Sequence, residues 1–153
     1  MKKTFTFRHM LVFIFTILSM ATNAEVINYI SDDGFVYDLD TETQNAEVKE
    51  YSGSATEIVV PESVEYNGGE YKVTRLGDQS FSFHGLTSID IPSTVTSIGE
   101  KCFYWCYYLT KVNIPASVTS IEYGCFGYCA NLTSINIPAS VTSIEDGCFR
   151  NCI

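Results

Sequence analysis

The stretch Leu132–Cys152, LTSINIPASVTSIEDGCFRNC, decides the fold, because the sequence before it repeats the same pattern almost residue for residue. Residues 86–108 and 109–131 are two complete units of 23 residues, and residues 132–153 form a third, incomplete unit. Self-similarity at this period indicates a stack of coils, in which each coil buries its apolar edge against the next. The sequence therefore predicts a short, mainly β solenoid with a parallel ladder of strands.

The pattern within one unit explains how a coil is built. Ile89 and Ile91 alternate with polar residues, which is the period of a strand with one buried face. Pro92 follows and ends the strand, because proline has no N–H to give to a ladder. Val95–Ile98 forms a second extended or turn segment, and Phe103 is expected to close the core. Strands stacked about 4.8 Å apart would place like side chains in columns.

An irregular unit, residues 58–85, precedes the regular ones. Ile58–Pro61 matches the strand with its proline, Val73–Leu76 matches the second segment, and Phe81 takes the core position. Between these segments, Asn67–Gly69 is a strong signal for a hairpin turn. We therefore predict a repeat that carries a hairpin insertion.

Upstream of this unit, residues 25–57 are predicted to form an N-terminal β cap. Two strands, Phe35–Leu39 and Ala46–Tyr51, flank a polar loop and form a β-hairpin. A cap is needed there because the first coil of a solenoid has to be shielded from solvent.

Residues 1–24 have the features of a secretory signal peptide. Three basic residues precede the apolar run Met10–Met20, and small residues end at Ala24, after which we expect cleavage. A membrane anchor is the alternative, but this run is about half of the ~20 residues that a spanning helix needs. The chain is therefore expected to be exported, to the cell surface, the extracellular medium or the periplasm, with no membrane span after cleavage.

The charge of the remaining chain narrows the class of partner. Residues 25–153 carry all 18 acidic residues and six of the nine basic ones, a formal charge of −12. Binding to phosphates requires clustered Lys and Arg, so we expect no nucleic-acid partner. The same charge disfavours docking on anionic lipid.

The repeated motifs resemble the BspA-like leucine-rich repeats of secreted and cell-surface proteins from bacteria and some protozoa. The resemblance covers Ile58–Ile153 in both spacing and residue identity. It implies a leucine-rich-repeat solenoid with a β-rich lead-in, no catalytic residues and no cofactor. It also implies an adhesin that binds host matrix proteins or other microbes. The family usually has Ala before the core Phe, where this chain has Cys102, Cys125 and Cys148.

The cysteines fall into two columns, Cys102, Cys125, Cys148 and Cys106, Cys129, Cys152. Export permits disulfides, and coil stacking near ~5 Å lies within the Cα separations that they span. Three cysteines in one column cannot all pair within it, however, so buried free thiols are the favoured interpretation. Zinc would need four converging ligands, whereas these sulfurs follow a line, so no metal site is predicted.

Other chemical signals are weak. His84 is the only histidine after residue 24, and it occupies the column of Cys106, which favours a structural over a catalytic role. Asp38, Asp40 and Glu42 alternate like the start of a calcium loop, but the sixth and twelfth positions do not fit. A solvated hairpin end is the better interpretation.

Candidate ligand-binding residues come from the columns that packing leaves free to vary. Outward strand positions form a polar stripe: Ser88, Asp90, Lys111, Asn113, Ser134 and Asn136. Aromatic residues gather beside the second cysteine: Tyr104, Trp105, Tyr107, Tyr108 and Tyr128. Trp and Tyr favour interfaces because they offer a large rigid apolar area with a polar tip. The alternative is that some of these rings only shield the edge of a coil.

The predicted function is an exported, non-enzymatic recognition or adhesion module that binds a protein or a glycan, such as a host matrix component. One alternative is a truncated structural piece of a larger surface protein. Another is a carbohydrate-active hydrolase domain, which only His84 and scattered carboxylates support.

Overall fold

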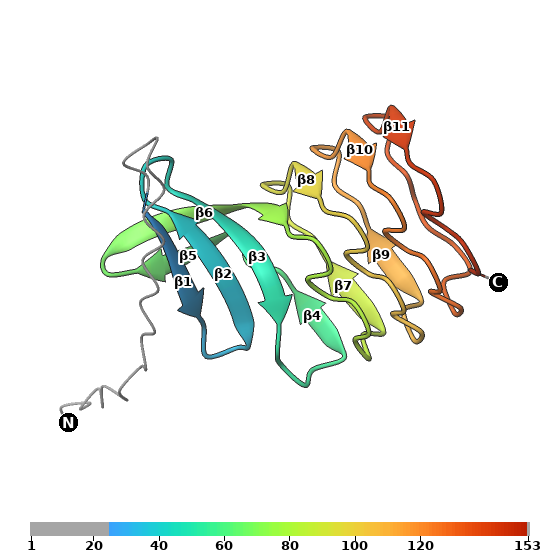
Figure 1. Cartoon of the computed structure of the whole chain (residues 1–153), viewed down its shortest axis with the longest axis horizontal. Coiled ribbons are helices and arrows are strands. Elements are labelled where there is room, and N and C mark those ends of the chain that lie inside the picture. Colours follow the sequence, from blue (N-terminus) through green and yellow to red (C-terminus); the bar gives the residue numbers. More distant parts are fainter. Residues whose placement is uncertain (1–24, 153) are drawn as a thin grey trace, which may run out of the picture.

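The computed structural model describes residues 25–152, in which every regular element is a strand. The predicted signal peptide lies outside these residues. The strands are numbered along the chain as in Figure 1: β1 (Val26–Ile30), β2 (Phe35–Asp40), β3 (Asn45–Tyr51), β4 (Glu57–Val59), β5 (Ser63–Tyr66), β6 (Gly69–Leu76), β7 (Ser88–Asp90), β8 (Ser97–Ile98), β9 (Lys111–Asn113), β10 (Ser120–Ile121) and β11 (Ser143–Ile144). No helix among the described residues is long and apolar enough to cross a bilayer.

The N-terminal part is an antiparallel meander of three strands, one more than the predicted hairpin. β2 pairs with β3 as expected, and β1 adds to the outer edge of β2. β3 then pairs in parallel with β6, the long strand that enters the first coil. The cap and the solenoid therefore share one sheet rather than meeting as two separate layers (Figure 1).

The hairpin insertion lies where the turn signal predicted it. β5 and β6 pair antiparallel across Asn67 and Gly68, whose φ values are 50° and 80°. Positive φ at both central residues is the geometry of a tight hairpin turn, which Asn and Gly adopt more readily than other residues.

Two parallel ladders form the walls of the solenoid and confirm the predicted stacking. β4, β7 and β9 pair in register, so that Ile58 lies beside Ile89 and Ile89 beside Val112. The third regular coil continues this ladder through a single bridge between Asn113 and Asn136. On the other wall β8 pairs with β6, and β10 with β11. Figure 1 shows the successive rungs side by side.

A column of phenylalanine rings fills the core between these walls. The ring centroids of Phe81 and Phe103 are 5.4 Å apart, those of Phe103 and Phe126 are 5.2 Å apart, and those of Phe126 and Phe149 are 5.6 Å apart. The planes are within 12° of parallel. The 23-residue period therefore produces the stacked columns that the sequence predicted.

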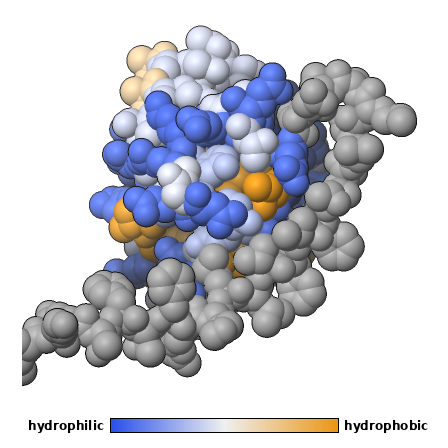
Figure 2. All heavy atoms as spheres, turned by 90° about the vertical axis from the view of Figure 1, so that its left-hand side faces the viewer, coloured by the Kyte–Doolittle hydropathy of each residue, from blue (hydrophilic) through white to orange (hydrophobic). Residues whose placement is uncertain are grey.

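Burial changes toward the two ends of the stack. Ile98 and Ile121 are fully buried, whereas Ile144 in the same column is 48% exposed because no coil in the structure packs on its far side. The view from the cap end is mostly hydrophilic, and hydrophobic side chains show only in small separate areas (Figure 2). This is the surface expected of an element that shields the first coil.

Candidate ligand-binding surface

Each coil contains two positions where the backbone adopts the left-handed conformation. The first column holds Gln79, Lys101, Gly124 and Gly147, and the second holds Phe83, Trp105, Tyr128 and Asn151. All eight φ values lie between 52° and 66°. Glycine adopts this conformation without strain, whereas a residue with a Cβ is destabilised there by about 1–2 kcal/mol. Three of the four residues in the second column are therefore aromatic at positions where glycine would be more stable.

These aromatic side chains stack along the outside of the solenoid. The ring of Phe83 lies 6.3 Å from that of Trp105, and the ring of Trp105 lies 5.0 Å from that of Tyr128, with planes 13° and 9° apart. Tyr104 lies edge-on to Phe83 and to Tyr128. Phe83 is 69% exposed and Trp105 42% exposed. We call Phe83, Tyr104, Trp105 and Tyr128 the aromatic cluster.

The structure thus divides the predicted aromatic set and adds one residue to it. Tyr107 and Tyr108 form a separate exposed pair with centroids 5.2 Å apart, on the turn that leads to β9. Phe83 lies in the irregular unit, whose match to the regular units is clearest at the core positions, and it was not among the predicted residues. Its signal was the offset from His84, which equals the offset of Trp105 from Cys106.

The predicted polar stripe lies on a different wall, the sheet of β4, β7 and β9. Pairing sets Ser88 beside Lys111, Asp90 beside Asn113, and Asn113 beside Asn136, while Ser134 lies exposed just before that bridge. Within residues 25–152, no hydrogen bond or ring contact joins this stripe to the aromatic cluster. The stripe and the cluster are therefore two separate surfaces.

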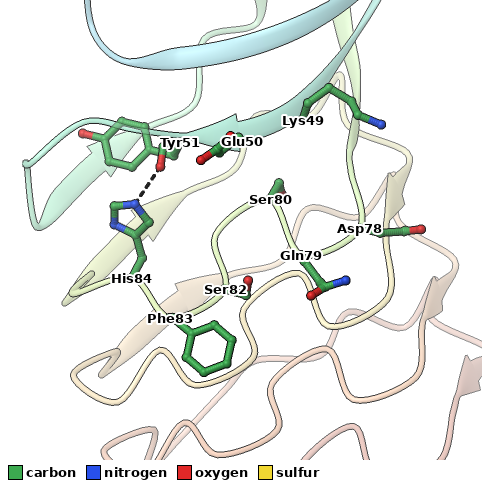
Figure 3. Close-up of a pocket in the computed structure, with 9 residues that line it drawn as sticks. All are labelled: Lys49, Glu50, Tyr51, Asp78, Gln79, Ser80, Ser82, Phe83 and His84. Atoms are coloured by element: carbon green, nitrogen blue, oxygen red, sulfur yellow. Dashed lines mark hydrogen bonds between the residues drawn. The ribbon is translucent and has the colours of Figure 1, made fainter.

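A pocket of about 500 Å³ lies where the cap meets the first coil (Figure 3). One side is formed by the end of β3, and the other by the coil that runs from Asp78 to His84. The lining residues are Lys49, Glu50, Tyr51, Asp78, Gln79, Ser80, Ser82, Phe83 and His84. Phe83 belongs to both the pocket and the aromatic cluster, so the two features are continuous.

Two contacts hold the coil against β3 beside this pocket. His84 Nε2–H donates to the carbonyl oxygen of Tyr51 at 2.6 Å, and the two rings are 5.1 Å apart. The amide of Tyr51 donates in turn to the carbonyl oxygen of Ser80 at 3.0 Å. His84 therefore joins the cap to the solenoid, in line with the structural role predicted for it.

Charged side chains around the pocket are mostly paired. Asp78 Oδ1 accepts a hydrogen bond from Arg75 at 2.9 Å and one from the amide of Glu100 at 3.1 Å. Lys49 lies within 3.5 Å of carboxylate oxygens of Asp38 and Glu47. Glu50 is exposed and has no ion pair among the described residues. It is thus the carboxylate at the pocket that no basic side chain neutralises.

The cysteines lie inside the solenoid as free thiols. Five of them are buried, and Cys152 in the last coil is partly buried. Cys106 Sγ donates to the carbonyl oxygen of Phe81 at 3.0 Å, and Cys129 Sγ to that of Phe103 at 3.1 Å. Burial raises the pKa of the Cys106 thiol to about 12 and that of Cys148 to about 11. The cysteine side chains act as small packing groups, and those of Cys106, Cys129 and Cys152 also donate to a backbone carbonyl of the preceding coil.

The predicted loop with alternating acidic residues is a capped turn. Asp40 Oδ1 accepts hydrogen bonds from the amides of Thr43 and Glu42 at 3.1 and 2.9 Å, and these bonds, that from Thr43 first, lower the pKa of Asp40. Within residues 25–152, no group of three or more His, Cys, Asp or Glu side chains is placed to hold a metal ion.

Comparison with known proteins gives one family. The model of the BspA type leucine rich repeat region matches residues 56–153 with six copies. No curated protein matches the chain.

Three solved structures share the fold. A leucine-rich repeat protein from Bacteroides capillosus is 27% identical, with a TM-score of 0.71 over 76% of this chain and 87% of that one. One from Bacteroides ovatus is 32% identical, with a TM-score of 0.76 over 81% of this chain and 33% of that one. A leucine rich cell surface protein from Faecalibacterium prausnitzii is 29% identical, with a TM-score of 0.66 over 82% and 40%. The chain thus spans less than half the length of the last two proteins.

Proposed function

The chain belongs to the BspA-type leucine-rich repeat family, and we propose that it is an exported, non-enzymatic recognition or adhesion module. Its ligand is a protein or a glycan at the cell surface, and host matrix components are one source of such ligands. The signal-peptide pattern in residues 1–24 supports export. The cell-surface description of the Faecalibacterium relative supports the same location.

The observation that carries this proposal is the exposed aromatic cluster at left-handed backbone positions. Trp105 has a φ of 61° and Tyr128 a φ of 63°, where glycine would be less strained. The neighbouring column does use glycine in its later coils, at Gly124 and Gly147. Strained residues that persist on a surface are a reason to infer a function for their side chains.

The chemistry of the cluster fits a binding surface. Trp105 carries an indole N–H and Tyr128 a hydroxyl on rings that stack on each other, so the cluster combines apolar area with groups that can form hydrogen bonds. Tyr107 and Tyr108 form a second exposed aromatic pair on the same coil. Such rigid aromatic groups are the residues that dominate the energetics of protein interfaces.

Capture experiments test the proposal. Trp105→Ala combined with Tyr108→Ala is expected to weaken capture of the protein by immobilised host matrix proteins and glycans by about tenfold or more. Tyr123→Ala is the matched control, because Tyr123 is also an exposed tyrosine but lies outside the aromatic cluster. Circular dichroism should be unchanged in both variants. Full retention of capture by the double variant would contradict the proposal.

A further inference from the structure

We propose that the pocket between β3 and the coil from Asp78 to His84 is a saccharide subsite that takes a neutral hexose unit. This inference rests on the proposed recognition function and specifies the class of ligand for one part of its surface. A pocket of about 500 Å³ lies within the range of small-molecule sites.

The backbone of the first coil leaves unused acceptors at this pocket. The amides of Gln79 and Phe83 donate to carbonyl oxygens of the next coil, at Glu100 and Tyr104 respectively. The equivalent carbonyls one coil earlier are those of Asp78 and Ser82. They belong to residues that line the pocket, and among the described residues no donor reaches either oxygen.

The reason for these free acceptors is the mismatch between the cap and the coil. In a regular coil, three alternate carbonyls accept amides of the preceding coil, as those of Glu100, Cys102 and Tyr104 do. β3 supplies only one such donor, the amide of Tyr51, which pairs with Ser80. The two outer carbonyls are therefore available to hydroxyl donors from a ligand.

Phe83 provides the apolar wall that a sugar ring needs. Its ring is 69% exposed and lines the pocket, and it stacks on Trp105 of the next coil. The ring therefore offers exposed aromatic surface within the lining of the pocket. The C–H face of a hexose packs favourably on such an aromatic face, while its hydroxyls reach the polar groups around the ring.

The polar groups favour a neutral sugar over a charged ligand. Lys49 and Arg75 are held by carboxylates, so the pocket has no unpaired cation among the described residues to bind a phosphate or a sulfate. Glu50 and the two carbonyls would accept hydrogen bonds from hydroxyls. Gln79 and Ser82 can both donate and accept, which matches hydroxyl groups better than an ammonium group, since ammonium can only donate.

Trp105 provides a direct optical probe of this pocket. It is the only tryptophan in the chain, and its ring lies 6.3 Å from that of Phe83. We expect the fluorescence of the purified protein to change in a saturable way with at least one of cellopentaose, laminaripentaose and mannopentaose, which are all built of hexose units. Isothermal titration calorimetry should give a matching affinity that is insensitive to salt, because the ligand is uncharged. No saturable change with any of the three would overturn the inference.

Variants separate the pocket from the rest of the surface. Phe83→Gly is expected to lower saccharide affinity about tenfold while the fold is kept, because glycine tolerates the φ of 60° at this position. Glu50→Gln should also weaken binding, since it replaces a charged acceptor with a neutral one. Tyr123→Ala lies outside both the pocket and the aromatic cluster and should bind as the wild type does. Unchanged affinity of Phe83→Gly would overturn the inference.

Two further probes distinguish the ways in which the ideas can fail. Stronger binding of spermidine than of any saccharide, with a steep loss at high salt, would overturn the saccharide assignment in favour of a cationic ligand. A second outcome would reject the subsite and leave the proposed function intact. In that outcome the variant with Trp105→Ala and Tyr108→Ala loses capture of matrix proteins, Phe83→Gly captures them as the wild type does, and no saccharide binds to the protein. Wild-type capture by both variants would reject the proposed function itself.

Discussion

The rings of Trp105 and Tyr128 stack with centroids 5.0 Å apart and planes 9° apart, although the residues lie 23 positions apart in the sequence. The amide of Trp105 donates to the carbonyl oxygen of Gly127 at 2.8 Å, which fixes the register of the two coils beside the rings. Stacking of an aromatic pair contributes about 0.5–1.5 kcal/mol. It offsets part of the cost of the left-handed backbone at both residues, which is of similar size.

The column of left-handed residues that contains Lys101 and Gly124 leads to a prediction about stability. Lys101→Gly should raise the free energy of unfolding by about 1 kcal/mol, because Lys101 has a φ of 52° and later coils use glycine there. Urea denaturation of the two proteins measures the difference. The converse change, Gly124→Ala, should destabilise the protein, since its φ is 63° and the new Cβ would lie 3.2 Å from Cγ of Lys101. A less stable Lys101→Gly variant would contradict the strain argument.

The phenylalanine column should be most sensitive at its centre. Phe126 is fully buried between Phe103 and Phe149, so Phe126→Ala should lower the free energy of unfolding by about 3–5 kcal/mol. Phe149→Ala should cost less, because that ring is only partly buried and has a neighbour on one side. Chemical denaturation of both variants tests the order, and equal losses would show that the end of the stack is as tightly packed as its middle.

The contact between His84 and the cap can be tested by removing one partner. His84→Ala leaves the carbonyl oxygen of Tyr51 without its donor, which should cost about 1–3 kcal/mol. Hydrogen exchange should become faster in β3, while the amides of β9 and β10 keep their wild-type protection. Tyr108→Ala serves as the control with an exposed side chain. Uniformly faster exchange across all coils would argue against a local role for His84.

The buried thiols make stability depend on alkaline pH. In the unfolded chain a cysteine ionises near pH ~8.5, whereas burial raises the pKa of Cys106 to about 12 in the folded protein. The folded state therefore keeps a proton that the unfolded state releases. Stability is at its full value below the ordinary pKa and falls as the pH rises toward the folded value.

Denaturation at several pH values measures this dependence. Cys106→Ala should reduce the slope of the free energy of unfolding against pH by up to about 1.4 kcal/mol per pH unit, in the window from about pH 9 to pH 11. Ser117→Ala is the control, because the serine side chain that it removes does not ionise in this pH range. An identical slope in wild type and Cys106→Ala would mean that this thiol is accessible to solvent.

The sequence predicted the elements whose residues recur at a fixed spacing. Ile89 and Val112 lie side by side because the same position in each unit needs the same burial. The strand Val26–Ile30 was missed because its alternation of exposed and half-buried positions carries little apolar periodicity, and it forms only at the edge of β2. Phe83 was missed because the irregular unit marks it only by its offset from His84, which equals the offset of Trp105 from Cys106 in the next coil.

The repeat sequence by itself determined the coil, its apolar columns and the placement of the buried cysteines, because each coil buries the same side chains against the next. Only the tertiary structure decided where the pocket lies. Tyr51 and Ser80 meet through one hydrogen bond at the junction of cap and coil, and this leaves the carbonyls of Asp78 and Ser82 without donors among the described residues. No residue type marks a free backbone carbonyl in the sequence, because the hydrogen bonding of a carbonyl depends on which strand packs against it and in what register.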